Sequence, residues 1–134
     1  MFSNIKTSKA NKERVTQLTS RLNLGPENVI ARLAFSYSLA QNRKLDLKQM
    51  ADAQGKEYNI KVLFGNYPDL YLSTLAMHYQ ISLNHLDIGK YVKMHIDDGL
   101  ELIDDVVKNT NSITGNDFII NEIEKSISNY ELLS

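Results

Sequence analysis

The stretch Gly25-Pro26-Glu27-Asn28-Val29-Ile30-Ala31-Arg32-Leu33-Ala34-Phe35-Ser36-Tyr37-Ser38-Leu39-Ala40-Gln41 decides the fold of this 134-residue chain. Pro26 suits the start of a helix, and Glu27 lies where the helix dipole favours an anion. Only Asn28, Arg32 and Ser36 form a clear polar stripe, so the predicted helix is apolar around most of its circumference. Such a helix must be covered on several sides, and it should be the hub of the core.

In a short chain, a second copy of the same helix is one candidate cover. We therefore expect copies of the chain to associate through the apolar residues of this helix. Arg32 is expected to satisfy a junction between subunits rather than to touch a polyanion. The predicted association residues are Val29, Ile30, Leu33, Phe35 and Tyr37.

Upstream of this helix, residues 3–9 predict a short strand and Asn11–Leu22 a second helix, separated from the first by the break at 23–25. This is the strand-helix-turn-helix order of a ribbon-helix-helix protein, in which two chains pair their strands and lay them into a DNA groove. The expected fold class is mainly α, a small helical domain with one or two short strands.

Downstream, one helical turn is expected within 46–53, and the alternation of Tyr58, Ile60, Val62 and Phe64 predicts a half-buried strand. A helix should begin at Pro68 and end near Ser82. A longer one should run from 90 to 108, with Gly99 on its buried face for the close approach of a neighbour. Its five acidic residues are expected on a solvated face: Asp97, Asp98, Glu101, Asp104 and Asp105.

After a polar loop at 109–116, a last helix from Asp117 carries an apolar stripe of Ile120, Ile123, Ile127 and Tyr130, which could dock on the core or on a partner. The predicted division is a helical domain at 1–110 and a C-terminal helical extension at 111–134.

Charge is unevenly distributed along the chain. Residues 1–61 hold 11 Lys and Arg against five Asp and Glu, a net charge of +6, whereas residues 62–134 carry −7. A basic half favours a polyanionic partner, and contacts to phosphates position a protein without reading bases. The residues predicted to contact double-stranded DNA are Lys6, Lys9, Lys12, Arg14, Arg21, Arg43, Lys44 and Lys48.

The composition also limits the chemistry. The chain has no cysteine, which excludes a disulfide framework and thiolate metal sites, and the start lacks the apolar core of a signal peptide, so we expect a cytoplasmic protein. No phosphate loop, nucleophile elbow or His-Glu-x-x-His motif is present. The residues that could do chemistry are His78, His85 and His95 with the carboxylates of Asp97 and Asp98. A small metal-assisted enzyme built on His78, His95 and Asp98 is a further alternative, but the spacing supplies no third ligand beside His95 and Asp98. We therefore expect a binding component with no enzymatic activity, no cofactor and no metal.

Three segments, in their order and spacing, resemble the DndE family of the bacterial DNA phosphorothioation, or sulfur-modification, system. They are Leu24–Leu39, then Tyr58–Gly65 leading into Tyr67–Met77, and His95-Ile96-Asp97-Asp98-Gly99-Leu100. The chain departs from the family at Asp97-Asp98, where a basic residue usually precedes the glycine, and the extension from Ile113 to Ser134 has no counterpart in the family.

The resemblance implies a mainly helical subunit, without activity of its own, that forms a homotetramer and works with other Dnd proteins. It also implies binding to duplex DNA, with a preference for nicks, through a lysine-rich surface that matches Lys6, Lys9, Lys12, Lys44 and Lys48 best. The alternative from the residues alone is a ribbon-helix-helix transcriptional repressor or antitoxin.

Overall fold

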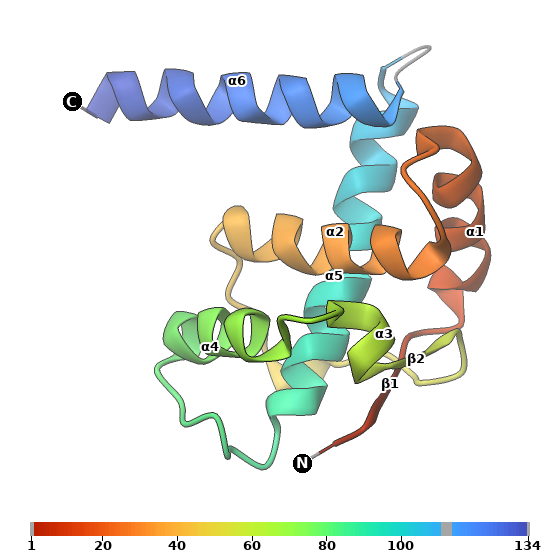
Figure 1. Ribbon diagram of the computed structural model, residues 1–134, viewed down its shortest axis with the longest axis vertical. Helices are drawn as coiled ribbons and strands as arrows, with labels where there is room; N and C mark the ends of the chain where they lie inside the picture. Colours follow the sequence, from red (N-terminus) through yellow and green to blue (C-terminus); the bar gives the residue numbers. More distant parts are fainter. Residues whose placement is uncertain (1, 111–113, 134) are drawn as a thin grey trace.

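The computed structural model describes residues 2–110 and 114–133, and over this part the chain is mainly helical with one small sheet (Figure 1). The expected fold class is confirmed. The elements, in chain order, are β1 (Asn4–Lys6), α1 (Ala10–Leu22), α2 (Glu27–Ala40), the 3₁₀ turn η1 (Leu47–Gln49), β2 (Glu57–Asn59), α3 (Ile60–Phe64), α4 (Pro68–Tyr79), α5 (Ile88–Lys108) and α6 (Gly115–Leu133).

The core is built on the crossing of α2 and α5 (Figure 1). Ile30, Ala34 and Phe35 of α2 are fully buried, as are Ile96 and Leu100 of α5. The predicted close approach at Gly99 is confirmed, since a β-carbon placed there would lie 1.8 Å from the carbonyl oxygen of Ala34. The principal cover of the apolar helix is therefore another helix of the same chain.

The turn between α1 and α2 depends on left-handed backbone. Asn23 ends α1 with φ 53°, and its N–H donates to the carbonyl of Thr19. Gly25 follows with φ +133°, a conformation that side chains disfavour. This turn lets α2 leave at a steep angle to α1.

The predicted strand over Tyr58 to Phe64 is wrong beyond Asn59. The strand β2 ends there and the helix α3 follows, because the Asn59 side chain caps it by accepting from the N–H of Lys61 at 2.9 Å. Leu63 and Phe64 are buried while Val62 is 55% exposed, which is the burial of a helix and not of alternating strand residues. The helix predicted to end near Ser82 also stops earlier, at Tyr79.

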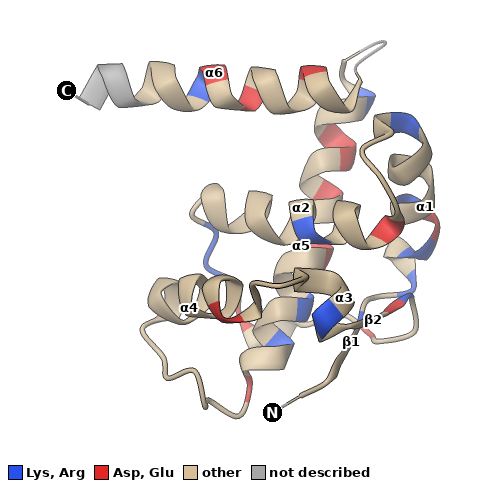
Figure 2. Cartoon of the chain, in the orientation of Figure 1, with Lys and Arg blue, Asp and Glu red and all other residues tan. Residues whose placement is uncertain are grey.

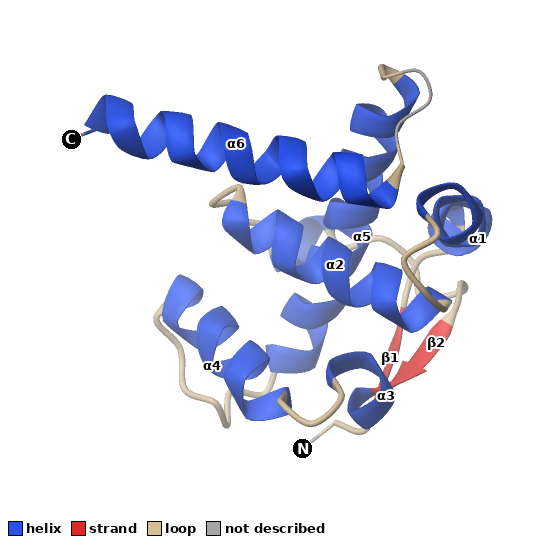
Figure 3. Cartoon of the chain, turned by 45° about the horizontal axis from the view of Figure 1, so that its top comes forward, coloured by secondary structure: helices blue, strands red, loops and turns tan. Residues whose placement is uncertain are grey.

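The small sheet forms within one chain. β1 pairs antiparallel with β2 (Figure 3), with Ile5 opposite Tyr58. The side chains of both residues are buried in the core. A ribbon-helix-helix dimer instead pairs the first strand with its copy from a second chain. The likeness to that fold therefore stops at the order strand, helix, turn, helix.

The acidic residues of α5 do not form a solvated face, and that prediction is wrong for three of them. Asp97 is buried, and its carboxylate accepts from Ser8, Asn11 and Lys93. Asp104 pairs with Arg14 at 3.1 Å, and Asp98 pairs with an arginine of the loop after α2. These carboxylates fasten α1 and the loop after α2 to α5.

Two of the predicted association residues lie inside the chain itself. Ile30 and Phe35 are 0% and 1% exposed, so they cannot touch a second copy, whereas Val29, Leu33 and Tyr37 are only partly buried. Arg32 is also satisfied within the chain, because its guanidinium donates to the carbonyls of Val62 and Leu63 at the end of α3. Arg32 therefore has partners without a second subunit, and its role at a junction between subunits stays a prediction.

The helix α6 runs alongside α2 above the body of the molecule (Figures 1 and 3). Phe118 docks it by packing against Tyr37, with ring centroids 5.4 Å apart. Burial and the neighbouring Glu122 carboxylate raise the pKa of Tyr37 to about 12. Ile120, Ile123 and Ile127 are each more than half exposed, so the apolar stripe is left open.

Residues 111–113 of the predicted polar loop, and the side chain of Tyr130, lie outside the described part of the chain. Among the described helices, none has the length and apolar character needed to cross a bilayer.

Candidate nucleic-acid interface

Three of the predicted DNA-contacting lysines gather where β1 leads into α1. Lys6 ends the strand, Lys9 precedes the helix, and Lys12 lies in its first turn. All three are exposed, and none of their ammonium groups has a hydrogen-bond or ion-pair partner among the described residues. The backbone is held in place, since the N–H of Lys9 donates to Asp52 at 2.9 Å. We call these three residues the α1 lysine cluster.

Arg14 and Arg21 lie on the same helix but bind other groups of their own chain. The Arg14 guanidinium binds Asp104 of α5 and the side chain of Asn11. Arg21 donates to the carbonyls of Val107 and Thr110, at 3.1 and 3.2 Å, where α5 ends. Both arginines thus join α1 to the end of α5, and part of each guanidinium is engaged within the chain, although Arg21 is exposed.

The remaining predicted residues lie after α2. The Arg43 guanidinium pairs with Asp98 at 2.9 Å, and the Lys44 ammonium donates to the carbonyl of His78 and lies 5.4 Å from the Tyr79 ring centroid. Lys48 of η1 is exposed, with no partner for its ammonium group within residues 2–110 and 114–133. Figure 2 shows basic segments along α1 and in the loop after α2, on different sides of the molecule, and acidic segments toward the end of α5 and on α6.

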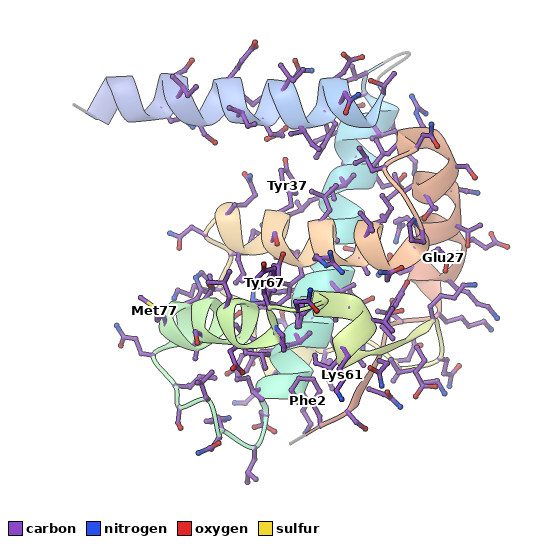
Figure 4. The ribbon with its side chains drawn as sticks, viewed as in Figure 1. Phe2, Glu27, Tyr37, Lys61, Tyr67 and Met77 are labelled. Carbon is purple, nitrogen blue, oxygen red and sulfur yellow. The ribbon has the colours of Figure 1, made fainter. Side chains whose placement is uncertain are left out.

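Lys61 of α3 is an exposed cation that the predicted set leaves out (Figure 4). Lys61 is one of the basic residues of the first half of the sequence. The strand predicted over residues 60–64 gives Lys61 an outward position but no role in binding.

His95 is buried at the centre of a hydrogen-bond network. We assign its hydrogens from the backbone N–H of Leu45, which donates to the Tyr79 hydroxyl at 3.0 Å. That hydroxyl then donates to Nε2 of His95 at 2.6 Å, and Nδ1–H of His95 donates to Ser38 Oγ at 2.7 Å. The Ser38 hydroxyl in turn donates to Asp98 at 2.6 Å.

This chain of hydrogen bonds uses both nitrogens of His95 and points Ser38 away from it, so Ser38 is not arranged as a nucleophile activated by a base. The ring of His78 contacts the Arg43 carbonyl instead of a shared metal position with His95. Within the described residues, no three His, Asp or Glu side chains converge in a way that could hold a metal ion.

Protonation of His95 should couple stability to pH. Burial and the charge of His78 lower the pKa of His95 from its ordinary 6.5 to about 4. Between these values the unfolded chain binds a proton that the folded chain does not, so stability is full above pH 6.5 and falls as the pH drops toward 4. The full effect corresponds to about 3 kcal/mol. Denaturant unfolding at pH 7 and pH 4.5 should show this loss.

The control is His95→Gln, which can still accept from Tyr79 and donate to Ser38 but does not titrate. Between pH 7 and pH 4.5, this variant should lose less stability than the wild type. The difference between the two losses should be about 1 kcal/mol or more, since one pKa unit corresponds to about 1.4 kcal/mol. Equal losses in both proteins would contradict the assignment of this pH dependence to His95.

Comparison with known proteins places the fold. The chain resembles the crystal structure of DndE from Escherichia coli B7A involved in DNA phosphorothioation modification, with 18% identity, a TM-score of 0.61, and coverage of 77% of this chain and 98% of that one. A DndE G21/24K mutant involved in DNA phosphorothioation gives a TM-score of 0.63 at the same identity and coverage. No curated protein matches the chain.

The family model for DNA sulphur modification protein DndE matches residues 4–111, from β1 to just past the end of α5. The match therefore covers the α2–α5 crossing, the small sheet and the α1 lysine cluster, while α6 lies beyond it. Because this match spans most of the sequence, the chain belongs to the DndE family.

Proposed function

We propose that the protein is a non-enzymatic subunit of a DNA phosphorothioation complex and binds duplex DNA through exposed lysines. The observation that carries the proposal is the α1 lysine cluster of Lys6, Lys9 and Lys12, whose ammonium groups have no partner in the described part of the chain. Free ammonium groups can neutralise phosphates and release counterions, which is the main source of affinity for a DNA backbone.

The predicted contact residues differ in whether their charged groups already have partners within the chain. Lys6, Lys9, Lys12 and Lys48 are free to reach phosphates, while Arg14, Arg21 and Arg43 would first have to leave carboxylates or carbonyls of their own chain. The Lys44 ammonium donates to the carbonyl of His78, so Lys44 is less available to a phosphate than the free lysines. We therefore assign the primary contacts to the α1 lysine cluster and Lys48.

Lysine contacts to phosphates favour binding without base reading. A nick adds flexibility and exposed ends to the duplex, and nicked DNA is the preferred target in our proposal. The proposal also places the protein in the cytoplasm with its DNA and with the other Dnd proteins.

Fluorescence anisotropy on intact and nicked duplexes across a salt series tests this function. We expect the association constant to fall steeply with salt, with a slope of about −0.9 for each phosphate neutralised. No binding to either duplex at low salt, or binding that does not change with salt, would disprove DNA binding by this chain.

The α1 lysine cluster should carry that affinity. Charge reversal by Lys9→Glu and Lys12→Glu together should weaken binding at low salt by about 100-fold and flatten the salt slope by about 2, because two phosphate contacts are lost. Stability should change little, since both side chains are exposed and unpaired. The measurement is the same anisotropy titration, with denaturant unfolding beside it.

The matched control is Lys125→Glu, a charge reversal on α6, outside the proposed surface. Its side chain is 65% exposed and, within the described residues, pairs with Glu122 alone. If Lys125→Glu weakened DNA binding as much as the double reversal, the effect would come from net charge and not from the α1 lysine cluster.

We further propose that copies associate as a homotetramer, using the part of α2 that the chain leaves open. Val29, Leu33 and Tyr37 are partly buried there, and the neighbouring helices expose Met77 of α4 and Ile123 and Ile127 of α6 beside it. Exposed apolar side chains gathered on one side of a protein favour association. Sedimentation equilibrium measures the resulting mass, and a monomer at all concentrations would rule out this assembly.

A further inference from the structure

One edge of β1 is unpaired. The carbonyl of Ser3 accepts from the N–H of Ile60, and the N–H of Thr7 donates to Lys56, so residues 3, 5 and 7 direct their backbone groups toward β2. In an antiparallel pair the intervening residues direct theirs the opposite way. The N–H and C=O groups of Asn4 and Lys6 therefore face away from β2, and none of the described residues hydrogen-bonds to them.

A cavity of about 600 Å³ lies along this free edge. It is lined by β1, by residues 83–86 and the start of α5, and by Met50 and Ala53 from the segment after η1. The start of β1 is anchored to α5, because a β-carbon on Gly89 would lie 3.0 Å from the ring of Phe2, and Figure 4 shows Phe2 beside this end of α5. The groove is therefore bounded by elements that are held together.

The cavity combines exposed apolar side chains with a basic lining. Leu83 and Leu86, from the segment before α5, also line the cavity and are 43% and 98% exposed, so two large apolar side chains are open to solvent there. The charged lining residues are Lys6, Lys90 and Lys93, and none of the lining residues is acidic. Lys93 is buried against Asp97 at 2.7 Å, and Lys90 lies 3.4 Å from Asp87 but is 58% exposed.

We infer that the free edge of β1 binds an extended acidic peptide segment of a partner protein as a third strand. Backbone groups of the peptide pair with Asn4 and Lys6, its apolar side chains cover Leu83 and Leu86, and its carboxylates meet Lys6 and Lys90. Strand addition of this kind takes affinity from main-chain hydrogen bonds and specificity from the flanking side chains.

Charge and shape favour this occupant over two others. The β1 strand of a second copy would bring another Lys6, with Lys9 close behind it, to a site already lined by lysines. Duplex DNA would satisfy the lysines but could not pair with a strand edge or cover the leucines. Lys6 thus protects the edge against neutral and basic strands, as edge lysines do, while admitting an acidic one.

The test uses the full chain and two fluorescein-labelled peptides, four Glu-Val repeats and four Lys-Val repeats. We expect the Glu-Val peptide to bind with a Kd of about 100 µM or tighter and the Lys-Val peptide not to bind. In amide hydrogen exchange followed by NMR, the Glu-Val peptide should slow exchange at Asn4 and Lys6 and leave Ile5, which already faces β2, unchanged. Absence of binding by the Glu-Val peptide, or protection elsewhere, overturns the inference.

A matched pair of variants separates the strand edge from simple charge attraction. Asn4→Pro removes the N–H that faces the cavity and spares the pairing with β2, and proline is tolerated at such edges. Asn4→Ala keeps that N–H, and both variants lose the Asn4–Asn59 side-chain contact. We expect Asn4→Pro to weaken peptide binding about fivefold or more relative to Asn4→Ala.

Lys90→Glu should weaken binding of the acidic peptide about tenfold, since it reverses an exposed charge that is not assigned to DNA.

Equal affinities of the proline and alanine variants for the peptide would show that no strand forms. A change of oligomeric mass in Asn4→Pro would assign the edge to a second copy, and loss of DNA binding in Lys90→Glu without any peptide binding would assign the cavity to DNA. Each of these results overturns the inference.

Discussion

Gly99→Ala should be among the most destabilising substitutions in this protein. The new β-carbon would lie 1.8 Å from the carbonyl oxygen of Ala34 and 2.4 Å from its carbonyl carbon. These are backbone atoms within a helix, so α2 and α5 must move apart as bodies, which opens the core at their crossing. Overpacking of a close-packed core costs about 1–3 kcal/mol and more where backbone must shift.

The same substitution raises the helix propensity of α5, and this stabilising effect opposes the destabilising clash. Replacing glycine by alanine inside a helix contributes about 1 kcal/mol. Because the clash is with backbone, we expect the cost to exceed this gain and the net loss of unfolding free energy to be about 2 kcal/mol or more. Urea unfolding of the two proteins, with the slope compared as well as the midpoint, measures it.

Two controls make the result specific. Asp105→Ala, on the exposed side of α5, gains helix propensity without a clash and should leave stability unchanged or slightly higher. Adding Ala34→Gly to Gly99→Ala should not restore stability, because the clashing atom is the carbonyl oxygen and not the Ala34 side chain. A Gly99→Ala protein as stable as the wild type would contradict the close approach of the two helices.

The prediction of Gly99 from sequence succeeded because it used information contained in one helix. A glycine on the apolar face of an otherwise regular helix costs propensity, so its presence indicates a close neighbour. The bounds of α1, α2 and α5 were predictable to within two residues for the same reason, since apolar periodicity, Pro26 and the break at 23–25 are local signals.

The errors came from partners that are distant in sequence. Asp97 was predicted to be solvated, yet its partner Asn11 lies 86 residues earlier and no local pattern reports it. The spacing of Lys93 and Asp97, four residues apart and each next to a core residue, was the one available signal. At 60–64, a nearly continuous apolar run fits a strand and a helix alike, and the cap at Asn59 decides between them.

The candidate site shows the same division. The exposure of the α1 lysine cluster was predictable, because most of its neighbours in sequence are polar or charged. Whether a given arginine was free could not be predicted, since Arg14 and Arg21 find their partners on α5 and just after it, 86 to 90 residues away. A count of basic residues therefore overestimates the interface, and only the structure separates free cations from those that hold helices together.

Asp97→Ala should lower stability about as much as any single change outside the apolar core. The carboxylate accepts from the backbone N–H of Ser8 at 3.1 Å, from Asn11 at 2.6 Å, and from Lys93 at 2.7 Å. The Lys93 side chain is only 7% exposed, and no other carboxylate in the described residues pairs with it. Removing the carboxylate would leave a buried ammonium group unpaired, which costs about 3–5 kcal/mol.

The double variant Lys93→Met with Asp97→Ala distinguishes this cause from the loss of hydrogen bonds to Ser8 and Asn11. With both charges gone, the unpaired ammonium disappears, and replacing a buried pair by apolar groups is often nearly neutral. We therefore expect the double variant to be about 2 kcal/mol more stable than Asp97→Ala alone, the remaining loss coming from Ser8 and Asn11. Lys125→Ala, which breaks the exposed Lys125–Glu122 pair on α6, should cost less than about 0.5 kcal/mol. If the double variant were no more stable than Asp97→Ala, the carboxylate would act mainly by holding the start of α1 through Ser8 and Asn11, and burial of the charge on Lys93 would not be the reason for the loss.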